Sequence, residues 1–115
     1  MFRRFFCACP SPAARVVYEV NLSFKSSKIR SDALDWLRAG HVDKVLGCKG
    51  FIFAELFECR DENTLIVRYT VASDTHLDEY LLVEAPKLRK EGLSLFGDEM
   101  VASRRIMRVL DTFNR

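Results

Sequence analysis

The sequence predicts one α+β domain in which four strands alternate with two helical segments. Its 115 residues are too few to bury two independent cores, so a second folded domain is not expected. Hydrophobic residues make up 49% of the chain and nine residues are Phe, which is enough apolar surface for a packed core. We therefore expect a folded domain over residues 16–112, preceded by an unordered N-terminal extension at residues 1–15.

The first strand and the first helix follow from the spacing of apolar residues. Residues 16–24 alternate between apolar and polar side chains, which is typical of a strand with one buried face. A helix then runs to about Leu46, with Ser31 or Asp32 as its N-cap and Gly47 at its C-terminus. The apolar stripe of this helix consists of Leu34, Leu37 and Val45.

A hairpin is expected in the middle of the chain. Residues 51–59 and 65–72 are rich in aromatic and β-branched side chains, and four polar residues, Arg60-Asp61-Glu62-Asn63, join them. Asn63 is the residue in this turn that best tolerates a positive φ angle.

A second helical segment begins at Ser73 or Asp74 and ends at Gly97. Pro86 lacks the amide donor of a continuous helix, so we expect a kink or a restart there, with Pro86 in the first turn of the second piece. The apolar side of the segment consists of Leu77, Tyr80, Leu81, Leu88 and Leu95. Residues 100–110 form the last strand.

The resulting element order is βαββαβ. Right-handed crossovers fold such a chain into a four-stranded antiparallel sheet in the spatial order 4-1-3-2, with both helices on one face. The sequence therefore predicts a ferredoxin-like fold.

The face of the sheet without helices is expected to be covered by a second copy of the chain. In the second strand one face carries Phe51, Phe53 and Phe57, and the other carries Ile52, Ala54 and Leu56. A strand with one face in water would alternate more strictly. A homodimer in which the two sheets face each other, a dimeric α/β barrel, would bury this surface.

The charge distribution and the lengths of the apolar runs argue against nucleic acids and membranes as partners. Arg3, Arg4 and Arg15 precede the first acid, Glu19, so the remaining chain holds 15 basic and 16 acidic side chains. A near-neutral body lacks the basic face that nucleic-acid binding requires. The longest apolar run is much shorter than the roughly 20 residues that span a bilayer, so no membrane partner is expected.

The N-terminal extension and the cysteines bear on location. The apolar run at residues 5–9 is too short for a secretory signal, whereas an organellar transit peptide remains open if the source is eukaryotic. Without an export signal the four cysteines are expected to be reduced, which favours the cytoplasm. Cys7 and Cys9 have no second Cys/His pair with matching spacing, so no metal site is expected.

A charged cluster is predicted on the uncovered face of the sheet. If Tyr18 faces the helices, Glu19 points away from them, and neighbouring strands could bring Arg68 and Arg104 to either side of it. The three side chains would then satisfy one another, because a buried carboxylate needs partners. Alternatively, the surplus positive charge would recruit an anionic small molecule.

His41 is the first candidate for chemistry, because it shares the helical stripe of Leu37 and Val45 and is aimed at or near the core. It is either a general base or a neutral ring that fills space. Tyr80 is either a phenol at a cavity mouth or a core residue. Glycine-rich phosphate loops, HExxH, paired CxxC and GxSxG are all missing from the sequence, so no cofactor is expected.

Four segments carry a resemblance to a known family: WLRAGHVDKVLGCKGF, VRYTVAS, EYLLVEAPKLRKEG and LFGDEMVASRRIM. Together they resemble a bacterial family of uncharacterised proteins, a domain of unknown function related to the dimeric α/β barrels. The positions that carry the resemblance are Trp36, His41, Phe51, Tyr69, Tyr80, Ala85, Pro86, Leu88, Arg89, Phe96, Gly97 and Arg104. The resemblance implies a ferredoxin-like dimer without an established activity. The wider superfamily includes cofactor-independent monooxygenases, haem-degrading enzymes, isomerases and small-molecule sensors, so fold alone does not decide function.

Three functions therefore stay open. The first is a dimeric protein that binds a small, anionic ligand near His41, Tyr80, Arg89 and Arg104, or between the sheets near Glu19 and Arg68. The second is a cofactor-independent monooxygenase or isomerase with His41 as general base and Arg104 stabilising an oxyanion. The third is a purely structural dimer.

Overall fold

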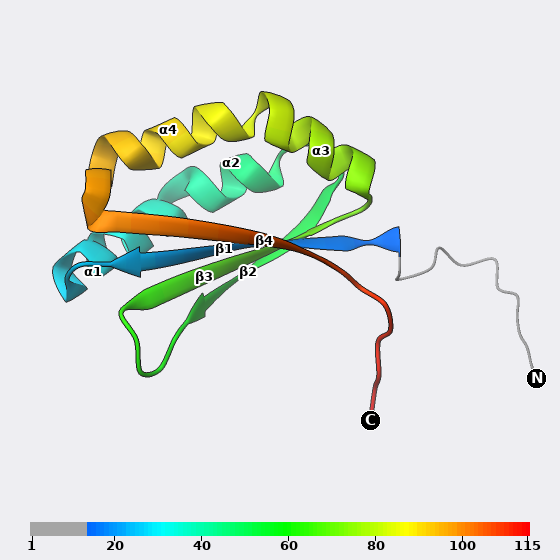
Figure 1. Ribbon diagram of the computed structural model, residues 1–115, viewed down its shortest axis with the longest axis horizontal. Helices are drawn as coiled ribbons and strands as arrows, with labels where there is room; N and C mark the ends of the chain where they lie inside the picture. Colours follow the sequence, from blue (N-terminus) through cyan, green and yellow to red (C-terminus); the bar gives the residue numbers. More distant parts are fainter. Residues whose placement is uncertain (1–13) are drawn as a thin grey trace, which may run out of the picture.

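The structure, a computed structural model that describes residues 14–115, is built on a four-stranded antiparallel sheet with all its helices on one face (Figure 1). The strands are β1 (Val16–Phe24), β2 (Phe51–Glu58), β3 (Thr64–Val71) and β4 (Met100–Arg108). The helices are α1 (Ser27–Trp36), α2 (Val42–Leu46), α3 (Asp74–Val83) and α4 (Ala85–Phe96), with a π-helical turn at Leu37–His41 and a 3-10 turn at Gly97–Glu99. The sheet order β2-β3-β1-β4 is the predicted order read from the other edge, so the ferredoxin-like fold is confirmed. The predicted extension lies almost wholly outside the described residues, as do Cys7 and Cys9.

The first helix begins earlier than predicted. Ser26, and not Ser31 or Asp32, is the N-cap: its backbone is extended and its hydroxyl oxygen accepts a hydrogen bond from the Ile29 amide at 3.2 Å. The prediction for the second helical segment is confirmed, because Ser73 caps α3 in the same way and Pro86 stands in the first turn of α4.

The hairpin differs from the prediction in its turn. No residue other than glycine has a positive φ among residues 14–115, so the expectation for Asn63 is wrong. Instead, the Asn63 side-chain amide donates to the Phe24 carbonyl at 3.1 Å, and the Asn63 carbonyl accepts from the Phe24 amide at 3.1 Å. The turn is held against the end of β1.

A β-bulge separates the phenylalanines of β2. Phe51 pairs with Val71 while Phe53 pairs with Thr70, so β2 contains one extra residue relative to β3 at this point. Phe51 therefore lies on the helix side, where its ring packs against Tyr80 at 4.9 Å. Phe53 lies on the other side and is 44% exposed. The prediction that Phe51, Phe53 and Phe57 share one face is wrong for Phe51.

The core lies between the helices and the sheet. Its largest fully buried side chains are Leu37, Leu65, Leu77, Val16, Val45, Val67 and Val71. Leu95 was predicted to face this core together with Leu77, Tyr80, Leu81 and Leu88. It is 60% exposed, so the prediction is wrong for this residue. None of the helices in residues 14–115 combines the length and apolarity of a membrane span.

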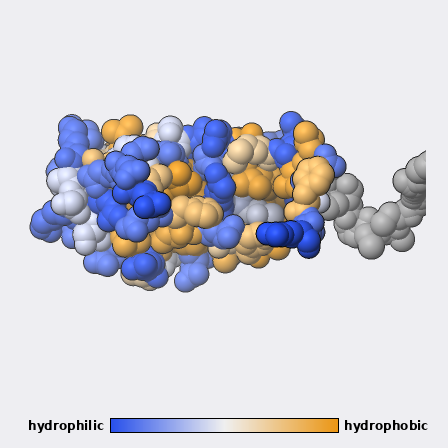
Figure 2. Space-filling model, turned by 90° about the horizontal axis from the view of Figure 1, so that it is seen from below, coloured by the Kyte–Doolittle hydropathy of each residue, from blue (hydrophilic) through white to orange (hydrophobic). Residues whose placement is uncertain are grey.

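The sheet surface turned away from the helices, called the open face below, carries Val17, Glu19 and Asn21 of β1 and the residues paired with them on the other strands. Figure 2 views the molecule from this side and shows hydrophobic areas lying between hydrophilic ones. Phe53, Phe57 and Val101 supply exposed apolar surface, at 44%, 37% and 60%. None of the helices of residues 14–115 lies over this face (Figure 1).

Candidate functional site

A small cavity lies between the helices and the sheet. It encloses about 50 Å³, enough for a few water molecules. Its aromatic and polar lining consists of Tyr18, Trp36, His41, Tyr69, Tyr80, Arg89 and Arg104. These residues come from β1, the α1–α2 segment, β3, α3, α4 and β4, so every layer of the fold contributes to this helix–sheet cavity.

Tyrosines form the strand side of the cavity. Tyr18 and Tyr69 are direct neighbours on β1 and β3, and their ring centroids lie 6.0 Å apart in a stacked arrangement. Tyr80 of α3 meets Tyr18 edge-on at 5.8 Å. Burial raises the pKa of Tyr69 and of Tyr80 well above the ordinary value, so both phenols carry their protons at neutral pH.

A π-helical turn shapes the opposite wall. The Val42 amide donates to the carbonyl of Leu37, five residues back, instead of four as in an α-helix. This wider turn brings residues five apart onto one side, and the rings of Trp36 and His41 stack at 4.0 Å. Gly92 of α4 permits the close approach, since a Cβ there would lie 3.1 Å from the Trp36 ring.

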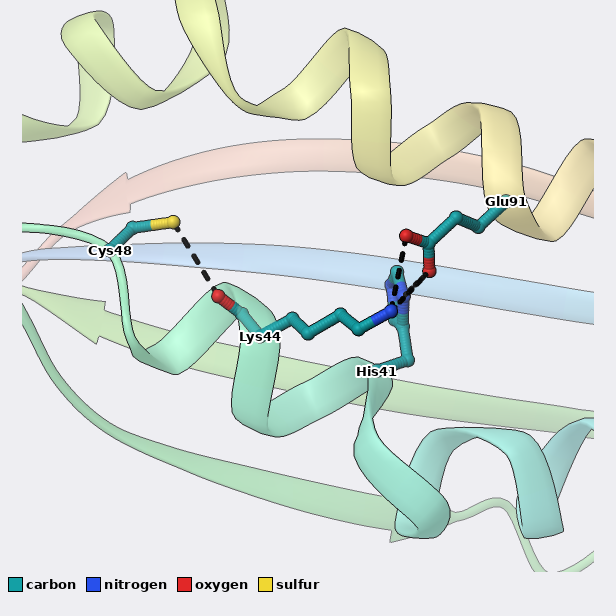
Figure 3. Close-up of polar contacts among 4 residues, drawn as sticks. All are labelled: His41, Lys44, Cys48 and Glu91. Carbon is teal, nitrogen blue, oxygen red and sulfur yellow. Dashed lines mark hydrogen bonds and ion pairs between the residues drawn. The ribbon is translucent and has the colours of Figure 1, made fainter.

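His41 is a largely buried, neutral imidazole beside a carboxylate. Its side chain is 13% exposed, and its Nδ1 atom is buried without a hydrogen-bond partner in the described chain. Glu91 Oε1 lies 3.9 Å from this nitrogen, while Lys44 Nζ lies 3.2 Å from both oxygens of Glu91 (Figure 3). Burial lowers the pKa of His41, which outweighs the nearby negative charge of Glu91. Near neutral pH the ring can therefore accept a proton.

Two arginines supply positive charge at the cavity. The Arg89 guanidinium donates to the Tyr18 hydroxyl oxygen at 3.0 Å, and Arg104 reaches the cavity from β4. Both side chains belong to exposed residues, so they stand at the mouth. Among the described residues that line the cavity, these two are the ones with a fixed charge. The arrangement favours an anion.

The predicted site residues separate into two groups. His41, Tyr80, Arg89 and Arg104 all line the helix–sheet cavity, although they are far apart in the sequence. A second group lies on the open face and contains Glu19 and Arg68.

Glu19 sits between two arginines, but one of them differs from the prediction. Arg68 Nε donates to its Oε1 at 2.8 Å, and Arg105 Nε donates to its Oε2 at 2.7 Å. Arg104 pairs with Val20 and so lies on the helix side of β4, which corrects its predicted place beside Glu19. The β4 register differs by one residue from the predicted one, and such a shift moves each side chain to the other face.

Sequence reasoning missed three contributors. Trp36 stands five residues before His41, a spacing that a regular helical stripe does not place on one side. The alternation of the first strand predicts Tyr18 only as a residue that faces the helices, and nothing in the sequence singles out Arg105. The sequence held no signal that separates Arg105 from Arg104, because only the pairing of β4 with β1 fixes which of the two adjacent arginines faces Glu19.

Residues 14–115 contain no group of three His, Cys, Asp or Glu side chains close enough to hold a metal ion. The fold and the cavity together define a ferredoxin-like α+β protein with a small cavity between its helices and its sheet. Residues 15–110 match the family described as "Domain of unknown function (DUF4286)", and the chain belongs to this family. Among functionally curated proteins, no sequence matches the chain.

Solved structures share the fold at low sequence identity. The monooxygenase ActVA-Orf6 of Streptomyces coelicolor, solved in complex with nanaomycin D, is similar with a TM-score of 0.74 at 14% identity over 91% of this chain and 96% of its own. SnoaB of Streptomyces nogalater, described as a cofactor-independent oxygenase, has a TM-score of 0.67 at 12% identity over 90% and 100%. Rv0793 of Mycobacterium tuberculosis has a TM-score of 0.65 at 16% identity over 87% and 99%. These likenesses establish the fold.

Proposed function

We propose that the chain is a homodimeric protein that binds a small anionic organic molecule in its helix–sheet cavity. One observation carries the proposal: the cavity combines two arginines with a neutral histidine and protonated tyrosines. A carboxylate or phenolate can pair with Arg89 or Arg104 while its apolar part contacts the ring of Trp36. Because the cavity has room for only a few water molecules, this mode of binding requires the exposed side chains of Arg89 and Arg104 to move apart and admit the ligand before they pair with its anionic group.

Trp36 provides the test, since it is the single tryptophan of the chain and lines the cavity. Titration with hydroxynaphthoate should change its fluorescence saturably, and the neutral analogue naphthol should bind more weakly. Arg89→Gln or Arg104→Gln should weaken hydroxynaphthoate binding by about tenfold, the loss of roughly one charge-assisted hydrogen bond. Arg60→Gln, in the exposed β2–β3 turn, is the matched control. Equal binding of both probes, unaffected by either cavity substitution, would rule out the anion site. Failure of both probes to bind would favour a structural dimer.

The second copy is proposed to cover the open face. Phe53, Phe57 and Val101 on this face expose between 37% and 60% of their surfaces. Exposed apolar surface bordered by polar residues often marks a protein–protein interface. In a two-fold dimer the same surface of each chain forms the interface, so the exposed apolar residues of both chains would be buried together.

A cofactor-independent oxygenase or isomerase is the second candidate. It is favoured by the two oxygenases among the similar structures and by the unpaired Nδ1 atom of His41. His41 would remove a proton from an activated methylene, and Arg104 would stabilise the resulting oxyanion. In the oxygenase case the methylene and O₂ are converted into a carbonyl and water, with the substrate supplying the electrons.

Oxygen uptake with anthrone as substrate separates the two candidates. An oxygenase should exceed the uncatalysed rate, and His41→Gln should lower turnover by about a hundredfold or more, since a general base contributes about that much. The same variant should still bind hydroxynaphthoate with only a modest loss. Unchanged turnover in His41→Gln would exclude His41 as the base.

We also propose that the protein works in a reducing compartment, such as the cytoplasm. Cys48 and Cys59 are free thiols in the structure. Structural disulfides are found mainly in oxidising compartments, so free thiols fit a reducing one.

A further inference from the structure

Four charged residues form one row across the open face. Strand pairing places Glu55 of β2 beside Arg68 of β3, Arg68 beside Glu19 of β1, and Glu19 beside Arg105 of β4. Directly paired residues of antiparallel strands point to the same side of the sheet. Because the sheet order is β2-β3-β1-β4, the row reads negative, positive, negative, positive from edge to edge.

The charges of this row are only partly paired within one chain. Glu19 is 4% exposed and binds both arginines. The side chains of Arg68 and Arg105 remain 43% and 65% exposed, so their guanidinium groups keep donors free. Glu55 is exposed and makes no ion pair with any residue from 14 to 115. The row can therefore form further ion pairs with a row of opposite charges on another molecule.

We propose that this row fixes the geometry of the dimer, with the two-fold axis parallel to the strands between two facing sheets. This inference rests on the proposed dimer and adds its orientation. Rotation about such an axis reverses the order of the row, so that Glu55 meets the partner's Arg105 and Arg68 meets the partner's Glu19. All four positions then face the opposite charge. A two-fold axis parallel to the row would keep the order and place like charges together, which is unfavourable.

The neighbouring row supports the same axis. It consists of Phe53, Thr70, Val17 and Met107. The rotation keeps this row opposite itself and reverses it, so the exposed ring of Phe53 meets the partner's Met107. Aromatic rings and methionine sulfur pack favourably. The apolar and the charged rows are thus both complementary in one orientation.

The sheet edges agree with this orientation. Strands β2 and β4 are the two edges of the sheet and leave backbone groups unpaired. Reversal of the strand order brings β2 next to the partner's β4 on both sides. The two sheets together then approach a closed barrel, with the row of charges across its interior.

Charge reversal at the two ends of the row tests the axis. Glu55 and Arg105 lie on opposite edge strands of one chain, so they meet only across the interface. Glu55→Arg alone and Arg105→Glu alone each place like charges together twice and should weaken dimerisation by at least about tenfold. An equal mixture of the two variants contains heterodimers in which both contacts are again of opposite sign. Sedimentation velocity of the mixture should therefore show the dimer restored.

Controls separate this proposal from the dimer itself. Circular dichroism reports folding of each variant, and Glu79→Arg on the exposed surface of α3 should leave dimerisation unchanged. If Arg105→Glu fails to fold, Glu55→Arg must still dimerise about tenfold more weakly than Glu55→Gln at low salt, and the difference must shrink at high salt. Folded variants that dimerise like the wild type, or a mixture that stays monomeric, would overturn the axis. A monomeric wild type would overturn the dimer as well.

Discussion

Glu19 shows how a single carboxylate is kept charged in the middle of a sheet. Only 4% of the residue is exposed, yet both of its oxygens receive guanidinium hydrogen bonds. The hydrogen bond from Arg105 holds the pKa of Glu19 below its ordinary value of 4.5, with Arg68 acting in the same direction against the opposing effect of burial. The charged form is therefore the stable form in the folded chain.

The depressed pKa of Glu19 predicts a pH dependence of stability. Its contribution is fully present above the ordinary carboxyl value and is lost as the pH falls from there through the folded-state pKa. Urea midpoints measured between about pH 7 and about pH 3 should fall more steeply for the wild type than for Glu19→Gln. Parallel curves for the two proteins would show that Glu19 is not the group responsible.

The sequence named several of the residues that line the cavity, but it did not predict how they are arranged. His41, Tyr80, Arg89 and Arg104 all line one cavity, but the helical stripes of the sequence placed only His41 and Tyr80 near the core, whereas Arg89 is among the positions of the family resemblance. Arg104 was nevertheless assigned to the wrong face, since a one-residue error in strand register is invisible in a segment with adjacent arginines. The partner role of Trp36 depends on a π-helical turn that no helical period anticipates.

At the scale of elements, the link from α2 to β2 depends on one glycine. Gly50 has a φ of 88°, a conformation that other residues rarely adopt. A Cβ at this position would lie 2.3 Å from the His76 ring, which is itself held by a hydrogen bond of 2.8 Å to the Ser73 hydroxyl. The start of α3 is thereby packed directly on the backbone that leads into β2.

Substitution of two neighbouring glycines tests this contact. Gly50→Ala should destabilise the fold by about 1–3 kcal/mol or more, because strain and the collision with His76 add together. Gly47→Ala is the matched control: its φ is −72° and its nearest neighbour would lie at an ordinary 3.4 Å. Thermal unfolding of both variants provides the comparison. Equal unfolding temperatures would contradict the assigned role of Gly50.

Element boundaries were predictable where the local chemistry was unambiguous. Pro86 and Gly97 correctly marked the restart and the end of α4, because one lacks an amide donor and the other adopts a φ of 56°. The start of α1 was misplaced because Ser26, Ser27 and Ser31 lie close together and offer competing N-caps, and the sequence does not say which one has an extended backbone. The bulge in β2 was missed because Phe51 and Phe53 have the regular spacing of one face.

At the scale of the whole molecule, the two faces of the sheet differ in what they contact. Its helix side forms the core and the cavity, while its open face carries apolar side chains and the alternating row of charges. The order of elements was enough to predict the topology, because handed crossovers leave few alternatives for a βαββαβ chain. What covers the open face could be argued only from its composition.

Sedimentation equilibrium of the wild-type chain tests this account most directly. A second copy on the open face predicts a mass of about twice 13.3 kDa at micromolar concentration, with Glu55→Arg shifting the equilibrium toward single chains. A mass of one chain throughout the concentration range would mean that the open face stays in contact with water, and would contradict the dimer and the geometry inferred for it.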